Sequence, residues 1–309
     1  GGRRLNDAFE KRIPLSPLAE TWECSTHPDG PSFAASGPME GQSLRQILRD
    51  YPEYLGQRHR GERQLPILVK FIDAKKDLSV QVHPDDGYAK EHEDGQLGKT
   101  EMWYVLDAGK DTKLVYGLKK DCTPEEIRAA LAAGTLSEEL QQVPVKKDDV
   151  FFLEPGTIHA LGAGALVAEI QESSNLTYRL YDYDRTDKHG NKRPLHTEKA
   201  LQVANLHGSS APRQPMRVLK YRQGVASELL TRCRYFEVFR MLLNTERRQK
   251  VTYRADSLSF RVLLCIGGCG SIRFGRETLL FYKGDCIFVP ADSETMVLHG
   301  QAQFLDIRG

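Results

Sequence analysis

Four side chains that could bind a metal ion lie in three separate segments of this sequence. Gln81 and His83 lie in VQVHPDDGYA, Glu101 in GKTEMWYVLD, and His159 in EPGTIHALGAG. Imidazole and carboxylate groups suit zinc, iron, nickel or manganese, and an amide oxygen is a weaker ligand. Two histidines and one carboxylate leave coordination positions open, as a catalytic metal requires. The spacing alone is also compatible with hydrogen-bonded polar residues near turns, because histidines often fill that role.

The elements that must position these residues are strands, because the chemically interesting side chains are two residues apart. Gln81 and His83 would share one face of a strand, and Lys99, Glu101 and Trp103 would share one face of another. The PDDG sequence between them predicts a turn. Polar groups aimed at a common interior need partners, and a bound cation is the simplest one.

Apolar runs predict strands along most of the chain, and capping signals predict a few short helices. The predicted strands cover residues 65–73, 113–117, 143–153, 166–173, 176–181, 236–243, 257–265, 270–274, 277–281, 286–289 and 295–298. The predicted helices cover residues 43–55 with Ser43 as N-cap, 124–133 between Thr123 and Gly134, 137–142, and 197–203. This pattern indicates a mainly β protein with a small helical insertion.

Two β-rich parts follow one another, joined by a Pro- and Ser-containing segment at residues 207–218. A charged turn, an apolar strand and a proline turn occur in both parts, as KDDVFFLEPG and as KGDCIFVPA. The second copy has no histidine at the matching place. We therefore expect two related β-barrels: residues 1–206 with the metal site and the helices, and residues 207–309 as a degenerate barrel without metal ligands.

Several long segments together resemble one known family. QVHPDDGYA, GKTEMWYVLDA, EPGTIHALGAG and TYRLYDYDR, in this order, are similar to type I mannose-6-phosphate isomerase in its short bacterial form, a phosphomannose isomerase of the cupin superfamily. The opening segments GGRRL and ETWECSTHPDG resemble it as well, and the resemblance runs to about residue 200. It implies two cupin-like, jelly-roll barrels and the interconversion of mannose 6-phosphate and fructose 6-phosphate through an enediol(ate).

The resemblance also implies a set of site residues. It places one Zn²⁺ per chain on Gln81, His83, Glu101 and His159. It gives Arg179 a catalytic role and puts Lys99 in the pocket, where both would add positive charge for the enediolate or the phosphate. The general base stays open between a zinc-bound water, Glu172, and Lys99 with a lowered pKa. Glu172 is equally compatible with orienting a metal ligand.

Two other functions fit the same residues. A non-haem iron oxygenase would use His83, Glu101 and His159, but a fourth ligand would fill a position that oxygen and substrate need. A non-catalytic, sugar-phosphate-binding cupin would keep the site without turnover. Metal identity and turnover distinguish these alternatives from the isomerase.

Composition limits the partners. The formal net charge of +1 predicts no nucleic-acid or membrane partner. The family resemblance implies a small-molecule sugar phosphate as the partner. There is no long apolar run and no apolar N-terminal signal core, so we expect no transmembrane helix. Six scattered cysteines without a CxxC pair are typical of reduced thiols and predict a cytoplasmic protein. The sequence leaves the oligomeric state open.

Overall fold

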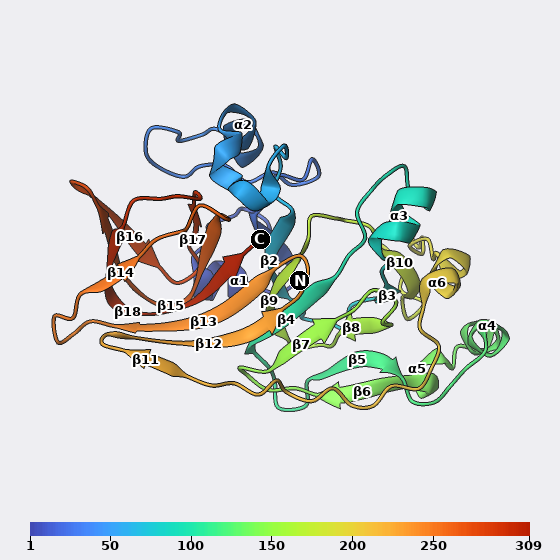
Figure 1. Ribbon diagram of the computed structural model, residues 1–309. Helices are drawn as coiled ribbons and strands as arrows, with labels where there is room; N and C mark the ends of the chain where they lie inside the picture. Colours follow the sequence, from blue (N-terminus) through green and yellow to red (C-terminus); the bar gives the residue numbers. More distant parts are fainter. The chain divides into compact units, whose positions relative to one another are not determined.

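The computed structural model describes all 309 residues as a mainly β chain with eighteen strands (Figure 1). Contacts divide the chain into two compact units. Unit 1 contains residues 1–3, 15–21 and 71–214, and unit 2 contains residues 4–14, 22–70 and 215–309. The mainly β class predicted from the sequence is confirmed.

Two five-stranded sheets carry the first ten strands. The first sheet has the order β1 (Glu20–Cys24), β2 (Ile67–Asp73), β9 (Leu166–Glu172), β4 (Glu101–Asp107), β7 (Val150–Leu153). The second sheet has the order β10 (Tyr178–Tyr181), β3 (Val80–Val82), β8 (His159–Leu161), β5 (Lys113–Leu118), β6 (Leu140–Pro144). Every strand of these sheets therefore has at least one hydrogen-bonded neighbour.

The second sheet is buried on both faces. On one face, Leu114 and Leu161 pack with Trp103 and Val167 of the first sheet. On the other face, its side chains pack against the helices of unit 1, including Ile127. Alternate residues of each strand therefore meet different neighbours, and the polar residues that face the first sheet lie in a closed interior.

Unit 2 contains an eight-stranded sheet. Its strands follow the order β11 (Lys220–Arg222), β12 (Val225–Arg232), β13 (Glu237–Asn244), β18 (Met296–Arg308), β15 (Arg261–Phe274), β16 (Glu277–Tyr282), with β14 (Val251–Tyr253) paired to β18 and β17 (Cys286–Val289) paired to β15. One hydrophobic cluster includes Met241 of β13, Val251 of β14, Phe281 of β16 and Phe304 of β18. The sheet therefore wraps around a single core.

The two closed barrels expected from the sequence are not found. Unit 1 buries its apolar faces by packing two separate sheets against each other, so closure is not needed to remove those faces from water. In unit 2, one long strand, β15, contains residues 261–265 of the strand predicted at 257–265 and all of the strand predicted at 270–274, while residues 257–260 are not in a strand. A bulge after Cys265 and the positive φ of 75° at Gly268 let this strand bend without ending.

The helices are short. They are α1 (Arg4–Phe9), α2 (Leu44–Asp50), α3 (Asp86–His92), α4 (Pro124–Ala133), α5 (Leu136–Glu139), α6 (Thr197–Val203), and the 3-10 helices η1 (Pro52–Leu55) and η2 (Gln57–His59). The Ser43 cap of α2 and the capping box of α4 are confirmed, because Ser43 and Thr123 accept hydrogen bonds from the backbone N–H groups that their positions predict.

Two local predictions are wrong. The PDDG segment is not a simple turn, because Asp85 caps helix α3 by accepting a hydrogen bond from the backbone N–H of Tyr88. The helix predicted at 137–142 ends at Glu139, and Leu140 begins strand β6. Pairing of Leu140 with β5 overrides the weak helical preference of this segment.

The division of the chain also differs from the prediction of a first domain at residues 1–206. Residues 22–70 group with the C-terminal part, because their backbone bonds to it. The carbonyl oxygen of Leu55 accepts from Phe260, and that of Tyr54 accepts from Ala291. The second boundary, between residues 214 and 215, falls within the segment predicted as a linker.

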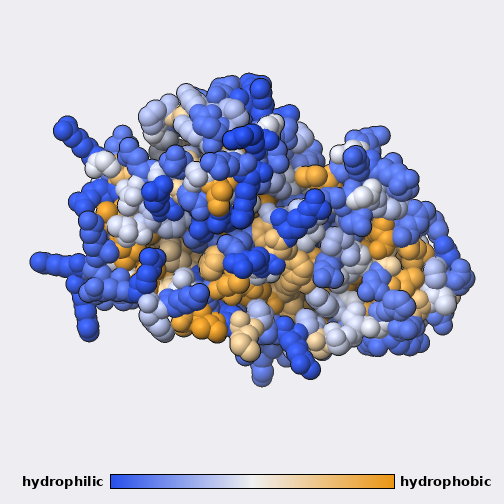
Figure 2. Space-filling view, in the orientation of Figure 1, coloured by the Kyte–Doolittle hydropathy of each residue, from blue (hydrophilic) through white to orange (hydrophobic).

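The helices of this chain are all too short or too polar to cross a bilayer. Hydrophilic residues cover most of the face shown in Figure 2, with smaller hydrophobic areas between them. This surface agrees with a chain in which 28% of the residues are charged.

Candidate metal centre

One row of side chains crosses the second sheet in unit 1. Arg179 of β10 lies opposite Gln81 of β3, which lies opposite His159 of β8, which lies opposite Tyr116 of β5. Residues directly opposite each other in antiparallel strands project from the same face. This row therefore brings together four residues from four different strands, on the face toward the first sheet.

The facing row of the first sheet supplies the carboxylate. Glu101 begins β4 and lies opposite Gln171 of β9, and Trp103 lies opposite Glu169. Trp103 packs edge-on against the imidazole of His159, with 5.4 Å between ring centroids. The two sheets thus hold Glu101 and His159 toward each other from opposite walls.

His83, Glu101 and His159 form a compact cluster that could hold a metal ion, with their ligand atoms all within 4.8 Å of one another. His159 Nε2 lies 3.1 Å from Glu101 Oε1, and His83 Nε2 lies 3.6 Å from Glu101 Oε2. Their exposed fractions are 2%, 0% and 1%. The three residues that the sequence singled out are therefore brought together and shielded from solvent.

Hydrogen bonds fix the Nδ1 position of both imidazole rings. His83 Nδ1 lies 3.0 Å from the carbonyl oxygen of Leu176, and His159 Nδ1 lies 2.8 Å from that of Thr157. A carbonyl oxygen only accepts, so in each ring Nδ1 carries the proton and donates. Burial, followed by the charge of Lys99, lowers the pKa of His83 well below its ordinary value, which keeps that ring neutral. Both Nε2 lone pairs therefore point into the cluster.

The donor set fits a cation. His83 Nε2 and both carboxylate oxygens of Glu101 are buried without a hydrogen bond. The short contacts between these atoms join acceptors to acceptors, which is unfavourable unless a positive charge lies between them. Two imidazoles and one carboxylate are ligands that a divalent transition metal accepts. The site residues themselves thus support a metal at this position.

Lys99 provides a fixed positive charge beside the cluster. Its Nζ lies 3.2 Å from Glu101 Oε2 and 3.9 Å from Glu169 Oε1, and the side chain is buried. Burial alone would lower the pKa of Lys99, but the two carboxylates outweigh it and hold that pKa above its ordinary value. The same ammonium opposes the effect of burial on Glu101 and keeps the Glu101 pKa well below its usual range. Lys99 is a cation here, which suits binding an anion.

Gln81 and Arg179 extend the site along the second sheet. The amide nitrogen of Gln81 lies 3.4 Å from His159 Nε2, and a half-turn of the amide presents its oxygen to the same point. Arg179 Nη1 donates to the carbonyl oxygen of Pro194 at 2.8 Å, while its Nε is buried without a hydrogen-bond partner. Arg179 therefore has donors left for a bound anion.

Glu172 projects away from this cluster. Its carboxylate accepts a 2.6 Å hydrogen bond from the backbone N–H of Thr100, whose side chain alternates with those of Lys99 and Glu101. Burial, followed by a hydrogen bond to Asp86, raises the pKa of Glu172 to about 8. The structure thus places Glu172 on the face of β9 opposite the metal cluster.

Two residues of β9 that the sequence analysis did not single out face the cluster instead. Glu169 accepts a 2.9 Å hydrogen bond from Trp103 Nε1, and Gln171 has a buried side-chain oxygen without a partner. All seven residues of β9 are buried, so alternation of apolar and polar residues gave no signal of which face is which. The spacing of two between Glu169 and Gln171 was the one available clue that these residues share a face of β9.

Comparisons with known proteins agree on one family. The family model for the phosphomannose isomerase type I catalytic domain matches residues 1–110. The mannose-6-phosphate isomerase ManA of Bacillus subtilis is 36% identical over 306 residues, which is 98% of this chain and 93% of that protein. The mannose-6-phosphate isomerase of Streptococcus mutans is 34% identical over 305 residues, which is 99% of this chain and 93% of that protein.

A third relative matches more strongly over a shorter range. The probable mannose-6-phosphate isomerase GmuF of Bacillus subtilis is 45% identical over 206 residues, which is 67% of this chain and 64% of that protein. The names of these relatives favour the isomerase prediction over the oxygenase and sensor alternatives.

Solved structures share the fold. The crystal structure of the mannose 6-phosphate isomerase from Bacillus subtilis superposes with a TM-score of 0.89 at 33% identity and covers 99% of this chain and 95% of that chain. A putative mannosephosphate isomerase from Archaeoglobus fulgidus superposes with a TM-score of 0.73 at 22% identity, covering 97% of this chain and 90% of that chain. With relatives above 30% identity along almost its whole length and a buried two-histidine, one-carboxylate cluster, the chain belongs to the type I phosphomannose isomerases.

Proposed function

We propose that this enzyme interconverts mannose 6-phosphate and fructose 6-phosphate through an enediol(ate). The observation that carries the proposal is the buried cluster of His83, Glu101 and His159 in a chain whose full-length relatives are named mannose-6-phosphate isomerases. The reaction moves one proton from C2 to C1 and one hydroxyl proton from O2 to O1, so no oxidant or reductant is needed.

One zinc ion per chain is the metal we assign to the cluster. His83, Glu101 and His159 would hold it, with the amide oxygen of Gln81 as the fourth ligand. When bound, zinc supplies Lewis-acid stabilisation of negative charge on the sugar oxygens. The backbone carbonyl groups of Leu176 and Thr157 fix the two histidines through their Nδ1 hydrogen bonds, which set the ring orientation and the tautomer.

Lys99 and Arg179 supply the positive charge that the reaction needs. A proton next to a carbonyl group is weakly acidic, so negative charge that develops on the enediolate must be stabilised. Lys99 is buried beside Glu101, and Arg179 stands in the same row as Gln81 with donors to spare. We assign Lys99 to the enediolate and Arg179 to the substrate anion, and the burial of the site strengthens both interactions.

Glu169 is our candidate for moving the proton between the two carbons. It is the carboxylate of β9 that faces the cluster, and Trp103 and Lys99 hold it in place. Of the side chains considered from the sequence, Glu172 projects from the other face and Lys99 carries a raised pKa, so both fit less well. A zinc-bound water stays the alternative to Glu169. Proton transfer by a positioned carboxylate is ordinary for such reactions.

Two broader predictions remain part of this proposal. The likeness to a solved mannose 6-phosphate isomerase supports a cupin-type arrangement, although the sheets described here are open. We also retain a cytoplasmic location, which suits the metabolic role that the substrates imply.

A coupled assay with mannose 6-phosphate tests the proposal. Enzyme stripped of metal should be inactive, zinc should restore turnover, and magnesium should not, because nitrogen ligands favour zinc over magnesium. A folded protein that binds the substrate but never turns it over, with any metal, would overturn the isomerase assignment in favour of a binding protein.

A further inference from the structure

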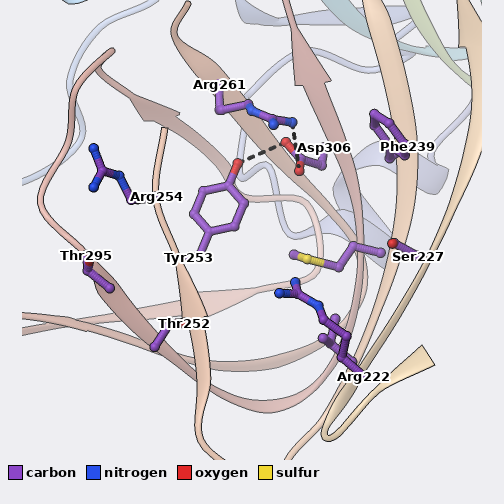
Figure 3. Close-up of a pocket in the computed structure, with 11 residues that line it drawn as sticks. Arg222, Ser227, Phe239, Thr252, Tyr253, Arg254, Arg261, Thr295 and Asp306 are labelled. Carbon is purple, nitrogen blue, oxygen red and sulfur yellow. Dashed lines mark hydrogen bonds and ion pairs between the residues drawn. The ribbon is translucent and has the colours of Figure 1, made fainter. Parts of the chain in front are cut away.

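A polar cavity lies wholly inside unit 2, and none of its lining residues belongs to the metal cluster of unit 1. Its volume is about 420 Å³, and it is lined by strands β11 to β15 and β18 together with Arg254 and Thr295 (Figure 3). It opens at one end of the hydrophobic core of the sheet, because Met241 and Val225 belong to both the core and the cavity wall. At this end of the sheet, polar side chains therefore replace the apolar side chains of the core.

The floor of the cavity is a buried carboxylate held by two donors. Tyr253 donates a 2.9 Å hydrogen bond to Asp306 Oδ1, and Arg261 Nη1 lies 3.2 Å from Asp306 Oδ2. Figure 3 shows both side chains converging on Asp306. Asp306 is 8% exposed. Each carboxylate oxygen has a second lone pair, so the floor can still accept hydrogen bonds from hydroxyl groups of a ligand.

One wall of the cavity is apolar and aromatic. Phe239 and Met241 line it from β13, and the ring of Tyr253 contributes from β14. Aromatic rings beside hydrogen-bonding groups suit ligands that have both C–H faces and hydroxyl groups, as carbohydrates and polyols do. Ser227 and Thr252 add neutral hydroxyls at the same cavity.

The cavity carries a net positive charge. Three arginines line it, Arg222, Arg254 and Arg261, against the single carboxylate of Asp306, so three positive charges less one negative charge leave +2. Arg261 is engaged with Asp306, whereas Arg222 and Arg254 are exposed. Arg254 forms an ion pair with Asp292, in which its Nη2 donates a 3.4 Å hydrogen bond to Oδ1. The guanidinium of Arg222 and the donors of Arg254 that do not bond Asp292 therefore remain at the cavity for a phosphate.

From this arrangement we propose that the unit 2 cavity is a binding site for a phosphorylated sugar or sugar alcohol, separate from the metal cluster of unit 1. The hydroxyl-bearing carbon chain lies between Phe239 and Asp306, and the phosphate lies between Arg222 and Arg254. No metal takes part, because the carboxylate already has donors. The inference does not depend on the isomerase activity, since it concerns a different set of residues.

Hydrogen exchange of the intact protein with sorbitol 6-phosphate tests this proposal, because this sugar alcohol phosphate has no carbonyl group to isomerise. We expect slower exchange in peptides that cover β12 and β14 of the wild-type protein. The double variant Arg222→Gln/Arg254→Gln should lose this protection, with an affinity at least about tenfold weaker for each guanidinium removed. The local readout separates this site from any binding of the same probe in unit 1.

The matched control is the double variant Arg273→Gln/Arg276→Gln. It makes the same change in net charge at two exposed arginines of unit 2 that do not line the cavity. It should retain wild-type protection. Inorganic phosphate and sorbitol, each used alone, should protect β12 and β14 at much higher concentrations than the joined molecule.

Three outcomes would overturn the proposal. The first is a wild-type protein without protection at β12 and β14 at millimolar probe. The second is equal loss of protection in both double variants, which would mean a general charge effect. The third is equal affinity for inorganic phosphate and sorbitol 6-phosphate, which would reduce the cavity to an anion site without carbohydrate recognition.

Discussion

Two buried carboxylates, Glu101 in unit 1 and Asp306 in unit 2, occupy similar places in their sheets but have different neighbouring groups. Each projects from an antiparallel strand into the interior of its unit. Glu101 faces two imidazole nitrogens on one side and the Lys99 ammonium, 3.2 Å from its Oε2, on the other, and both of its oxygens lack a hydrogen bond. Asp306 receives a phenol O–H and a guanidinium.

The difference lies in the neighbours rather than in the carboxylates. The side of Glu101 that faces the imidazoles is unfavourable until a metal cation lies there, whereas both oxygens of Asp306 already have donors. Glu172 represents a third solution, because burial and Asp86 raise its pKa to about 8 and it keeps a proton at neutral pH. A cation, fixed donors and a proton are therefore three ways in which this one chain buries a carboxyl group.

The largest effect should follow from breaking the cation site. His159→Ala removes one ligand, and we expect zinc binding to weaken by more than about a hundredfold, since even loss of a residue that only orients a ligand costs about 10–100-fold. Turnover should fall to the assay background. Metal content per chain, measured by atomic emission after dialysis, checks this. Asp306→Ala is the matched change in unit 2 and should leave zinc content unchanged; equal zinc in His159→Ala and wild type would refute the assignment.

The two carboxylates of β9 should differ sharply. Glu169→Gln is expected to lower kcat by about 10²–10⁴-fold, the usual contribution of a positioned acid or base. Glu172→Gln should change kcat by only a few-fold, because the amide imitates the protonated carboxyl on the opposite face. Steady-state kinetics with mannose 6-phosphate compares them. The reverse order of effects would return the catalytic role to Glu172.

Arg179→Ala should keep zinc and lose turnover. We expect kcat/KM to fall by about 10²-fold, since the variant lacks a donor that is aimed at developing or bound negative charge. Arg179→Lys keeps the charge without the planar fork, so it should recover part of the loss. Normal kinetics in Arg179→Ala, with normal zinc content, would show that this arginine only supports the loop through Pro194.

Glu172 should make stability fall as pH rises. Its folded-state pKa of about 8 is above the ordinary value of 4.5, so the folded protein binds this proton more tightly. The resulting stabilisation is complete below about pH 4.5 and is lost as pH rises through about 8. We expect the unfolding temperature of the wild type to fall by roughly 5 °C more than that of Glu172→Gln between pH 5 and pH 9. An equal change of unfolding temperature with pH in the two proteins would contradict a raised pKa of Glu172.

The smallest effect concerns the donors of Asp306. Tyr253→Phe removes one hydrogen bond but leaves Arg261 in place, so the expected loss is about 1 kcal/mol of unfolding free energy. Chemical denaturation measures it. Tyr221→Phe, at a side chain that is 77% exposed, is the control and should be neutral. If Tyr253→Phe increased the unfolding free energy, the hydrogen bond from Tyr253 to Asp306 would not stabilise the fold.

Local signals in the sequence predicted local structure well. The Ser43 cap and the Thr123 capping box act through neighbouring backbone groups, so nothing distant had to be known. The spacing of two between Gln81 and His83 likewise predicted a strand that places both side chains on one face. Motif resemblance then assigned the family, which the relatives confirm.

By itself, the sequence therefore determined the residue types of the metal cluster, the mainly β class and the short capped helices. Only the tertiary structure decided that Glu169, rather than Glu172, faces the cluster, because β9 is buried on both faces and its partners alone distinguish them. It also decided that residues 22–70 group with the C-terminal sheet, and that Asp306 meets Tyr253 and Arg261. These outcomes depend on contacts between residues far apart in the chain, whose pairing no local pattern encodes.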